Sequence, residues 1–427
     1  MSAEIAVALA GTGAVVGEAG PADAVAGVAP ACVAYPGTVE QAAGVMTAVA
    51  GLGMTVLPRG SGRTISWGPP PACCDVITDM TQMDRILEHA SGDLVVRAEA
   101  GVTVGQLAKV LAEKGQRLAL DAHPGATVGG VVAMGTAGPL RLRYGTSRDL
   151  LIGITVVRPD GRVAHAGGRV VKNVAGYDIG KLFAGSRGTL GLITEATFRL
   201  HPLAAHTTYV TRDYDDAAAA AEAVLAAAAS PLQASAAEIS RPEPGAPVGA
   251  GIMLEGNASG VRERADRMAG LLGNGAQAAL EAPGWWGQQG EASAGPVGGT
   301  LVRVTFWAAE LRRVLDAIDA VAVDAGVTPA VNGSAGAGVL YISLDAGEDA
   351  DQVAVFVRAL RAATGHGRAD DQRALARGSV VVLTAPASVQ ASVDMWGPVP
   401  GLALMRAVKR QFDPGGTMAP GRFAGGI

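Results

Sequence analysis

A run of small and polar residues after Leu57 has the composition of an anion-binding loop. It reads Pro58-Arg59-Gly60-Ser61-Gly62-Arg63-Thr64 and follows a short apolar stretch that predicts a strand. Glycines can adopt positive φ, which lets successive backbone N–H groups point at one anion. Ser61 and Thr64 add hydroxyl donors, and Arg59 or Arg63 would offset negative charge. These residues suit a pyrophosphate, although taken alone the pattern also fits an ordinary Gly-Ser-Gly turn.

Glycine is also dense in a second and a third segment of the chain. The second runs from His123 to Gly138 and is followed by Arg143-Tyr144-Gly145 and Asp149. The third comprises Lys172 to Asp178 and then Gly185 to Glu195. Because glycine costs conformational entropy wherever it is ordered, such density indicates close approach of the backbone to a ligand or to another backbone. The order of the three segments is more specific than any one of them.

Alternating apolar runs and helical stretches must position these segments. From Val33 to Pro202 we expect strands at 32–36, 54–58, 75–78 and 94–98, helices at 38–51 and 103–114, a hairpin of 150–157 with 162–165, and an extended segment at 190–200. Thr38 is the expected N-cap of the first helix, and Gly115 should end the second. After Pro202 we expect helices at 214–229 and 308–325, strands at 251–255, 301–306, 338–344 and 379–384, and loops at 241–249 and 273–299.

Length, charge and cysteine usage narrow the class of protein. A chain of 427 residues exceeds what one hydrophobic core usually organises, so we expect two domains. The net charge of -5 and pI of about 5.7 argue against a nucleic-acid partner. Cys32, Cys73 and Cys74 form no metal-binding pattern, and their odd number favours reduced thiols in the cytoplasm. The N-terminus lacks the basic flank of a signal peptide, and Glu222 interrupts the longest alanine-rich tract, so we expect no membrane span.

The three glycine-rich segments together resemble the PCMH-type FAD-binding domain of the vanillyl-alcohol oxidase superfamily. The stretch Val171 to Asp178, which reads Val-Lys-Asn-Val-Ala-Gly-Tyr-Asp, is similar to one in the FAD-binding E subunits of bacterial glycolate oxidases. The resemblance covers Val33 to Pro202, and the tail around Phe412 to Gly416 and Pro420 to Phe423 resembles the end of the same family. It therefore touches both ends of the chain.

The resemblance implies an α+β fold in which a two-subdomain PCMH-type FAD-binding domain is followed by an α+β cap domain. The implied ranges are an N-terminal extension at 1–32, the FAD-binding domain at 33–202, the cap or substrate domain at 203–400, and a C-terminal segment at 401–427 that returns to the FAD domain.

The resemblance also implies which residues bind FAD, mostly through backbone groups. Residues 59–64 would wrap the pyrophosphate. Residues 124, 125 and 127–130 would line the middle of the cofactor, and residues 188–193 would lie near the adenine. No Cys or His stands where a covalent flavin link can be argued, so we expect noncovalent FAD and no metal. The predicted cofactor-binding residues are Pro58, Arg59, Gly60, Ser61, Gly62, Arg63, Thr64, Pro124, Gly125, Thr127, Val128, Gly129, Gly130, Gly135, Thr136, Gly145, Asp149, Gly188, Gly191 and Ile193.

Catalytic residues are harder to assign. Catalytic glycolate-type subunits and D-lactate dehydrogenases carry a Gly-His-Ala-Gly-Asp-Gly-Asn-Leu-His motif, whereas Gly333 to Tyr341 lacks both histidines and the aspartate. Tyr341 or Tyr177 remain candidates for proton transfer, and His123 is the histidine beside a predicted flavin loop. We therefore name no catalytic base.

Three functions follow from these observations. In the first, the chain is the FAD-binding subunit of a glycolate oxidase-like complex for a small 2-hydroxy acid, joined by a larger flavin subunit and an iron–sulfur subunit, with membrane contact only through those partners. In the second, it is a stand-alone FAD-linked dehydrogenase of a hydroxy acid or alcohol. In the third, it is a flavin-binding scaffold without turnover.

Overall fold

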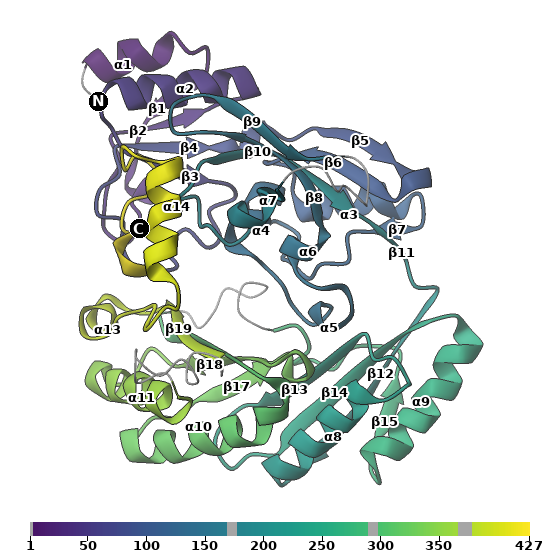
Figure 1. The fold of residues 1–427 in the computed structure, drawn as a ribbon. Helices are drawn as coiled ribbons and strands as arrows, with labels where there is room; N and C mark the ends of the chain where they lie inside the picture. The colour runs from purple at the N-terminus through teal and green to yellow at the C-terminus, as the bar shows by residue number, and fades with distance from the viewer. Residues whose placement is uncertain (1–2, 169–176, 289–297, 366–377) are drawn as a thin grey trace. The chain divides into compact units, whose positions relative to one another are not determined.

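The computed structural model describes residues 3–168, 177–288, 298–365 and 378–427 and divides into two compact units (Figure 1). Unit 1 consists of Met1–Thr136, Thr146–Leu203 and Gly401–Ile427. Unit 2 consists of Ala137–Gly145 and Ala204–Pro400. Both units mix helices with sheets, in agreement with the predicted α+β class.

The first sheet of unit 1 is a small, largely parallel one with strand order β1-β2-β4-β3. Its strands are β1 (Val15–Glu18), β2 (Cys32–Tyr35), β3 (Val56–Arg59) and β4 (Val76–Asp79). Helix α2 (Val39–Gly51) connects β2 to β3, and Thr38 caps it as predicted, because the Thr38 side chain accepts a hydrogen bond from Gln41 N at 3.2 Å. The stretch expected to be an N-terminal extension thus contributes β1, after helix α1 (Ala3–Ala10).

The C-terminal segment joins this sheet beside β3. Met418 forms a parallel bridge with Val56, so residues from the far end of the chain lie next to the strand that leads into the predicted anion loop. In Figure 1 the yellow C-terminal segment and α14 (Leu402–Phe412) lie beside the purple strands of this sheet. The first sheet is therefore assembled from both ends of the sequence.

The second sheet of unit 1 is antiparallel with strand order β5-β6-β10-β8-β9. The predicted hairpin is present as β8 paired with β9, and the predicted extended segment is β10. Thr103 and Gln106 form a capping box at the start of α3, and Gly115 has φ of +65° after its end. The elements are β5 (Ile86–Ala90), β6 (Val95–Glu99), α3 (Val104–Ala112), β7 (Gln116–Arg117), α4 (Val128–Met134), α6 (Ser147–Leu150), β8 (Leu151–Val157), β9 (Val163–Gly167), α7 (Gly180–Phe183), β10 (Leu192–Arg199) and β11 (His201–Pro202).

Unit 2 is built on one antiparallel sheet with strand order β15-β12-β14-β13-β17-β18-β16-β19. Strand β15 lies inside the stretch expected to be a loop at 273–299, and residues 289–297 of that stretch lie outside the described residues. The elements are α5 (Arg141–Tyr144), β12 (His206–Tyr214), α8 (Ala217–Ala229), β13 (Ala236–Arg241), β14 (Val248–Gly256), α9 (Ala258–Leu272), β15 (Gln277–Ala279), β16 (Thr300–Phe306), α10 (Leu311–Ala325), β17 (Ala330–Gly333), β18 (Val339–Leu344), α11 (Ala350–Ala363), β19 (Gly378–Thr384) and α13 (Ala387–Ser392).

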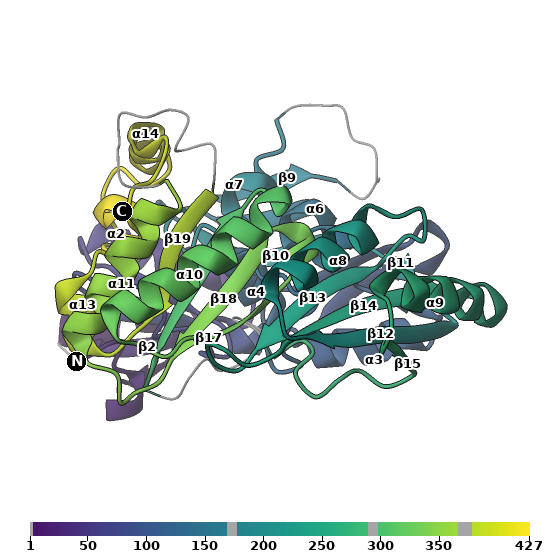
Figure 2. The ribbon, with the colours of Figure 1, turned by 90° about the horizontal axis from the view of Figure 1, so that it is seen from below.

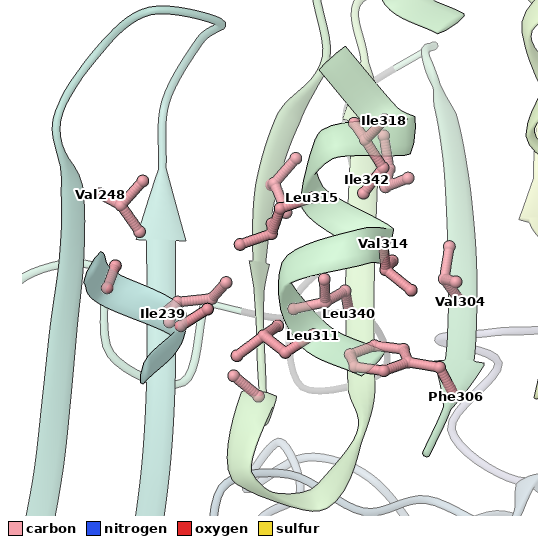
Figure 3. Close-up of a cluster of buried hydrophobic side chains, with 14 of the residues drawn as sticks. Ile239, Val248, Val304, Phe306, Leu311, Val314, Leu315, Ile318, Leu340 and Ile342 are labelled. Carbon is pink, nitrogen blue, oxygen red and sulfur yellow. The ribbon is translucent and has the colours of Figure 1, made fainter. Parts of the chain in front are cut away.

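The longer helices of unit 2, α8, α9, α10 and α11, cover one face of its sheet, which Figure 2 views from the helix side. The core lies between the two layers. Figure 3 shows α10 placing an apolar stripe against the strands; its residues follow the helical repeat and are Leu311, Val314, Leu315 and Ile318. No helix in the described part of the chain is both long enough and apolar enough to pass through a bilayer.

The opposite face of this sheet carries the short segment Ala137–Gly145. Its Leu140 clusters with Ala236 and Met253, which alternate along β13 and β14 with residues of the main core. The Tyr144 hydroxyl donates a hydrogen bond to Glu255 Oε2 at 3.1 Å. This part of the second glycine-rich segment therefore belongs to unit 2, whereas the rest of that segment belongs to unit 1.

Candidate functional site

The predicted anion loop directly follows β3. Gly62 has φ of +73°, a conformation that side chains rarely adopt. No atom among the described residues accepts a hydrogen bond from the amides of Gly60, Ser61, Gly62, Arg63 or Thr64. Five consecutive N–H groups without a protein acceptor are what an anion-binding loop requires. The loop therefore fits a diphosphate.

The second glycine-rich segment touches this loop through Thr127. A Cβ at Gly60 would lie 2.0 Å from Thr127 Oγ1, so only glycine fits beside that hydroxyl. Thr127 is buried and caps α4, because its side chain accepts from Gly130 N at 3.3 Å. The two segments are thus in direct contact at a position where a larger residue than Gly60 would not fit.

Gly129 of the second segment allows close packing of helix α4 against the backbone at Ala100. Val128 N donates to Val102 O and Gly129 N donates to Ala100 O, both at 2.8 Å. A Cβ at Gly129 would lie 2.7 Å from the Cβ of Ala100. The amides of Val128, Gly129 and Gly130 therefore already have acceptors. What these residues would offer a ligand is a surface without bulky side chains, rather than the N–H donors that we expected.

His123 and Arg63 lie close enough to influence each other. Gly125 N donates to His123 Nδ1 at 3.0 Å, so in the neutral ring the proton resides on Nε2. Partial burial, followed by the charge of Arg63, lowers the pKa of His123 below its usual range. The ring therefore stays neutral at physiological pH. Pro124 contacts α3 instead, since its carbonyl accepts from Gly105 N at 2.8 Å.

The third segment meets both of the others. A Cβ at Gly188, which has φ of +76°, would lie 3.0 Å from Pro58 Cγ. The amides of Gly185 and Arg187 donate to Val132 O at 2.9 Å and Ala133 O at 2.8 Å, near the end of α4. The structure thus brings residues 58–64, 123–136 and 185–195 of the three predicted segments together within unit 1. Of the other predicted residues here, Gly191 packs against Val157 O, and Ile193 is buried in β10.

Arg59, a predicted cofactor-binding residue, forms ion pairs with two carboxylates. Its Nη1 lies 2.6 Å from Asp23 Oδ1 and its Nε lies 2.7 Å from Asp79 Oδ2. The hydrogen bond from Arg59 is the main reason that the pKa of Asp23 lies below its ordinary value. Two carboxylates therefore neutralise this guanidinium, and Arg63 is the arginine of the loop that can offset an anion.

Four other predicted residues lie at helix ends. Burial alone would raise the pKa of Asp149, but hydrogen bonds from Thr146 N and Oγ1, both at 2.8 Å, outweigh it and hold that pKa low. Asp149 thus caps its own helix, α6. Gly135 ends α4 with φ of +68°, and Thr136 beside it is buried. Gly145 ends α5, which places it in unit 2.

Two cationic side chains near the C-terminus, Arg422 and Lys409, contact residues beside the first glycine-rich segment and within the third, and sequence reasoning did not predict either contact. Arg422 donates hydrogen bonds to carbonyls of residues 65–69, and Lys409 Nζ donates to Thr189 O at 2.8 Å. The family resemblance of the tail was the signal in the sequence, because Arg422 stands in its Pro-Gly-Arg-Phe motif. The motif alone did not indicate what the guanidinium contacts.

The candidates for proton transfer are found in different settings. Tyr177 is 93% exposed, and the neighbouring residues Val171 to Gly176, with Lys172, lie outside the described residues. Tyr341 is buried on β18, directly opposite Arg303 on β16 and Asn332 on β17. Because Leu340 and Ile342 belong to the main core, Tyr341 and its two partners lie on the other face of the sheet.

Comparison with known proteins identifies the amino-terminal part of the chain. Residues 30–167 match the family described as FAD binding domain. The mitochondrial D-lactate dehydrogenase [cytochrome] of Arabidopsis thaliana is 33% identical over 210 residues, which cover 49% of this chain and 37% of that protein. Glycolate oxidase subunit GlcD of Bacillus subtilis is 31% identical over 199 residues, covering 46% and 42%. The chain therefore spans less than half the length of these relatives.

Solved structures share the fold over almost the whole chain. p-Cresol methylhydroxylase with substrate bound has a TM-score of 0.70 at 18% identity and covers 92% of this chain and 89% of its own. Chitooligosaccharide oxidase has a TM-score of 0.66 at 15% identity and covers 97% of each chain. At such identities the likeness establishes the fold of the chain, and the family match establishes the cofactor of its first part, FAD.

Proposed function

Because residues 30–167 form an FAD binding domain within a PCMH-type fold, we propose that the chain is an FAD-dependent oxidoreductase acting on the CH–OH group of a small hydroxy acid. The relatives named as D-lactate dehydrogenases and as a glycolate oxidase subunit support this choice of substrate class. The observation that carries the proposal is the loop Gly60–Thr64, whose amides have no acceptor among the described residues.

In this proposal each part of the site has a task. FAD, when bound, accepts hydride from the substrate carbon. The amides of residues 60–64 hold its pyrophosphate, and Arg63 offsets the negative charge. The glycines at 125, 129, 130, 188 and 191 keep side chains away from the cofactor. Neutral His123 can donate a hydrogen bond through Nε2 without adding charge, and FAD is held noncovalently.

We further propose that the chain is the FAD-binding subunit of a glycolate oxidase-like complex, with a larger flavin subunit and an iron–sulfur subunit as partners. The stretch Gly333 to Tyr341 supports this because it lacks the two histidines and the aspartate of the catalytic motif. Residues 203–400 would then be a cap domain that no longer supplies a base. Free thiols at Cys32, Cys73 and Cys74 support a reducing compartment, the cytoplasm.

One observation favours the alternative of a stand-alone dehydrogenase. Tyr341, Arg303 and Asn332 lie opposite one another on three neighbouring strands of unit 2. A guanidinium suits a substrate carboxylate, and a phenol beside it suits transfer of the hydroxyl proton. Such a row could replace the missing histidines without help from another subunit.

Anaerobic reduction of the flavin separates these functions. Glycolate or D-lactate is added to the purified holoprotein, alone and with co-expressed partner subunits, while the flavin absorbance is followed. Bleaching only with the partners supports the subunit proposal. Bleaching of the chain alone supports the stand-alone alternative, and Tyr341→Phe should then slow bleaching without releasing FAD. Absence of bleaching in both preparations contradicts an oxidoreductase and leaves a flavin-binding scaffold.

A further inference from the structure

The last part of the C-terminal segment, residues 413–427, runs alongside the chain on both sides of the anion loop. On the entry side, Val56 N donates to Thr417 O and Ala419 N donates to Val56 O, both at 2.8 Å. On the exit side, Ala72 N donates to Pro420 O at 2.8 Å. The segment is therefore hydrogen-bonded to the chain both before and after the loop.

Arg422 of this segment binds the residues that directly follow the loop. Its side chain is 7% exposed, and its two terminal nitrogens donate to the carbonyls of Ile65, Trp67 and Pro69. Each carbonyl that turns toward the guanidinium fixes the plane of its peptide group. Because residues 65–69 are connected directly to the amides of residues 60–64, these contacts restrict the shape of the anion loop.

The charge of Arg422 has no counter-charge within the described part of the chain, where no carboxylate forms an ion pair with it. Burial lowers the pKa of Arg422 to about 10, so the guanidinium stays charged at neutral pH. Arg59, in contrast, is neutralised by Asp23 and Asp79. A cation without a counter-charge among the described residues, held against the chain that directly follows the anion loop, favours a doubly charged ligand.

Lys409 anchors the third glycine-rich segment in a similar way. Its Nζ donates to Thr189 O at 2.8 Å and to Met418 O at 2.7 Å, and it forms an ion pair with Asp413 Oδ2 at 2.7 Å. Thr189 follows Gly188, which packs on Pro58. Asp413 neutralises the ammonium group, so Lys409 contributes geometry and Arg422 contributes both geometry and charge.

We propose that Arg422 is a positioning residue for FAD: it holds the loop that binds the pyrophosphate in shape and places a positive charge against the residues that directly follow that loop. The proposal rests on the cofactor and not on the substrate. It assigns a part in cofactor affinity to a residue more than 350 positions after the loop.

The test compares Arg422→Gln and Arg422→Lys with the matched control Arg361→Gln. Arg361 of unit 2 is also buried and also donates to backbone carbonyls, Val380 O at 3.1 Å and Met395 O at 3.3 Å. Apoprotein of each full-length variant is titrated with FAD and with riboflavin, which lacks phosphates, and thermal unfolding is recorded in parallel.

We expect Arg422→Gln to weaken FAD binding by about ten-fold or more, the size of one lost charge-assisted interaction. Riboflavin affinity should change less, because riboflavin does not use the anion loop. Arg422→Lys should recover part of the FAD affinity, and Arg361→Gln should lower thermal stability but keep the FAD affinity within about two-fold of the wild type. If Arg422→Gln does not fold, the lysine variant alone carries the comparison.

Three results overturn the proposal: unchanged FAD affinity in both Arg422 variants, an equal loss of FAD affinity in Arg361→Gln, or an equal loss of riboflavin and FAD affinity. A wild-type protein that binds no FAD overturns the cofactor assignment as well. The two proposals can fail separately. If the wild type binds FAD, hydroxy acids do not bleach the flavin, and Arg422→Gln weakens FAD binding, then this proposal is supported and the proposed function is contradicted.

Discussion

At the scale of single residues, glycine has three distinct uses in the proposed site. Gly60 leaves room for the Thr127 hydroxyl, Gly62 provides a backbone conformation with φ of +73°, and Gly129 lets α4 approach Ala100. Of these, only the conformation of Gly62 acts directly on the amides of residues 60–64, which have no acceptor in the described part of the chain. The sequence indicated that glycine was important here, but it could not distinguish the three uses, because each depends on a neighbour that is distant in the chain.

Gly62→Val should abolish flavin retention. Gly53→Val provides the matched control, since Gly53 too has a positive φ, of +64°, and open space around its Cβ position. Both substitutions should cost about 1–2 kcal/mol of folding free energy through backbone strain. Only Gly62→Val should also distort the anion loop. The measurement is the visible spectrum of the purified variants together with their unfolding free energies, and a yellow Gly62→Val protein would contradict the proposed site.

The three cysteines should differ sharply in reactivity. Cys73 is exposed, whereas Cys32 and Cys74 are buried and burial raises the pKa of the Cys74 thiol to about 12. Since the thiolate is the reactive form, a disulfide reagent at about pH 8 should modify Cys73 alone in the native protein. Denaturation should expose the remaining thiols. Cys73→Ser should remove the fast reaction, and fast reaction of a second thiol would show that the buried pair is accessible.

At the scale of elements, local patterns were predictable and contacts between elements were not. Thr38 and Thr103 cap their helices as hydroxyl residues ahead of apolar repeats commonly do. Helix α4, in contrast, was not predicted, because Gly129 and Gly130 disfavour a helix locally and its stability depends on packing against Ala100 and Val102. That packing also consumes the amides that we expected to contact the cofactor.

The ion pair between Asp23 and Arg59 should contribute a pH-dependent part of stability. It ties the turn before β2 to the end of β3, and both side chains are mostly buried. Because the folded-state pKa of Asp23 is lowered from 3.8, its contribution is present above that value and is lost as pH falls through the lower, folded-state pKa.

Asp23→Asn should therefore lower the unfolding free energy by about 1 kcal/mol at neutral pH, and the deficit should shrink in acid. Glu263→Gln is a suitable control, since the ion pair of Glu263 with Arg267 is mostly exposed and should contribute almost nothing. Denaturant titrations of both variants across the acid range measure the difference. A deficit that persists unchanged below the folded-state pKa would show that the charge of Asp23 is not its cause.

At the scale of the whole molecule, each unit is assembled from separated stretches of chain. Residues 137–145 belong to unit 2 and residues 401–427 belong to unit 1. The sequence suggested the second of these through the family resemblance of the tail. It gave no indication of the first, because Leu140 becomes a core residue only once β13 and β14 have formed the surface on which it packs. Long-range packing of this kind leaves no local pattern.

Separate cores predict separate unfolding transitions. FAD at about 100 times its dissociation constant should stabilise unit 1 by about 2.7 kcal/mol. The transition of unit 2 should move less, and Arg361→Gln identifies that transition because Arg361 lies in unit 2. Differential scanning calorimetry with and without FAD measures both. A single transition that moves as one would show that the units unfold cooperatively.

The way the C-terminal segment completes the first sheet has a consequence for biosynthesis. The ribosome synthesises residues 204–400 as one uninterrupted stretch, after the glycine-rich segments but before Lys409 and Arg422 exist. Until those two cations leave the exit tunnel, the loops they hold lack their anchors. If Arg422 holds the loop as proposed, flavin loading should follow translation of the tail, and a nascent chain stalled near residue 400 should emerge colourless.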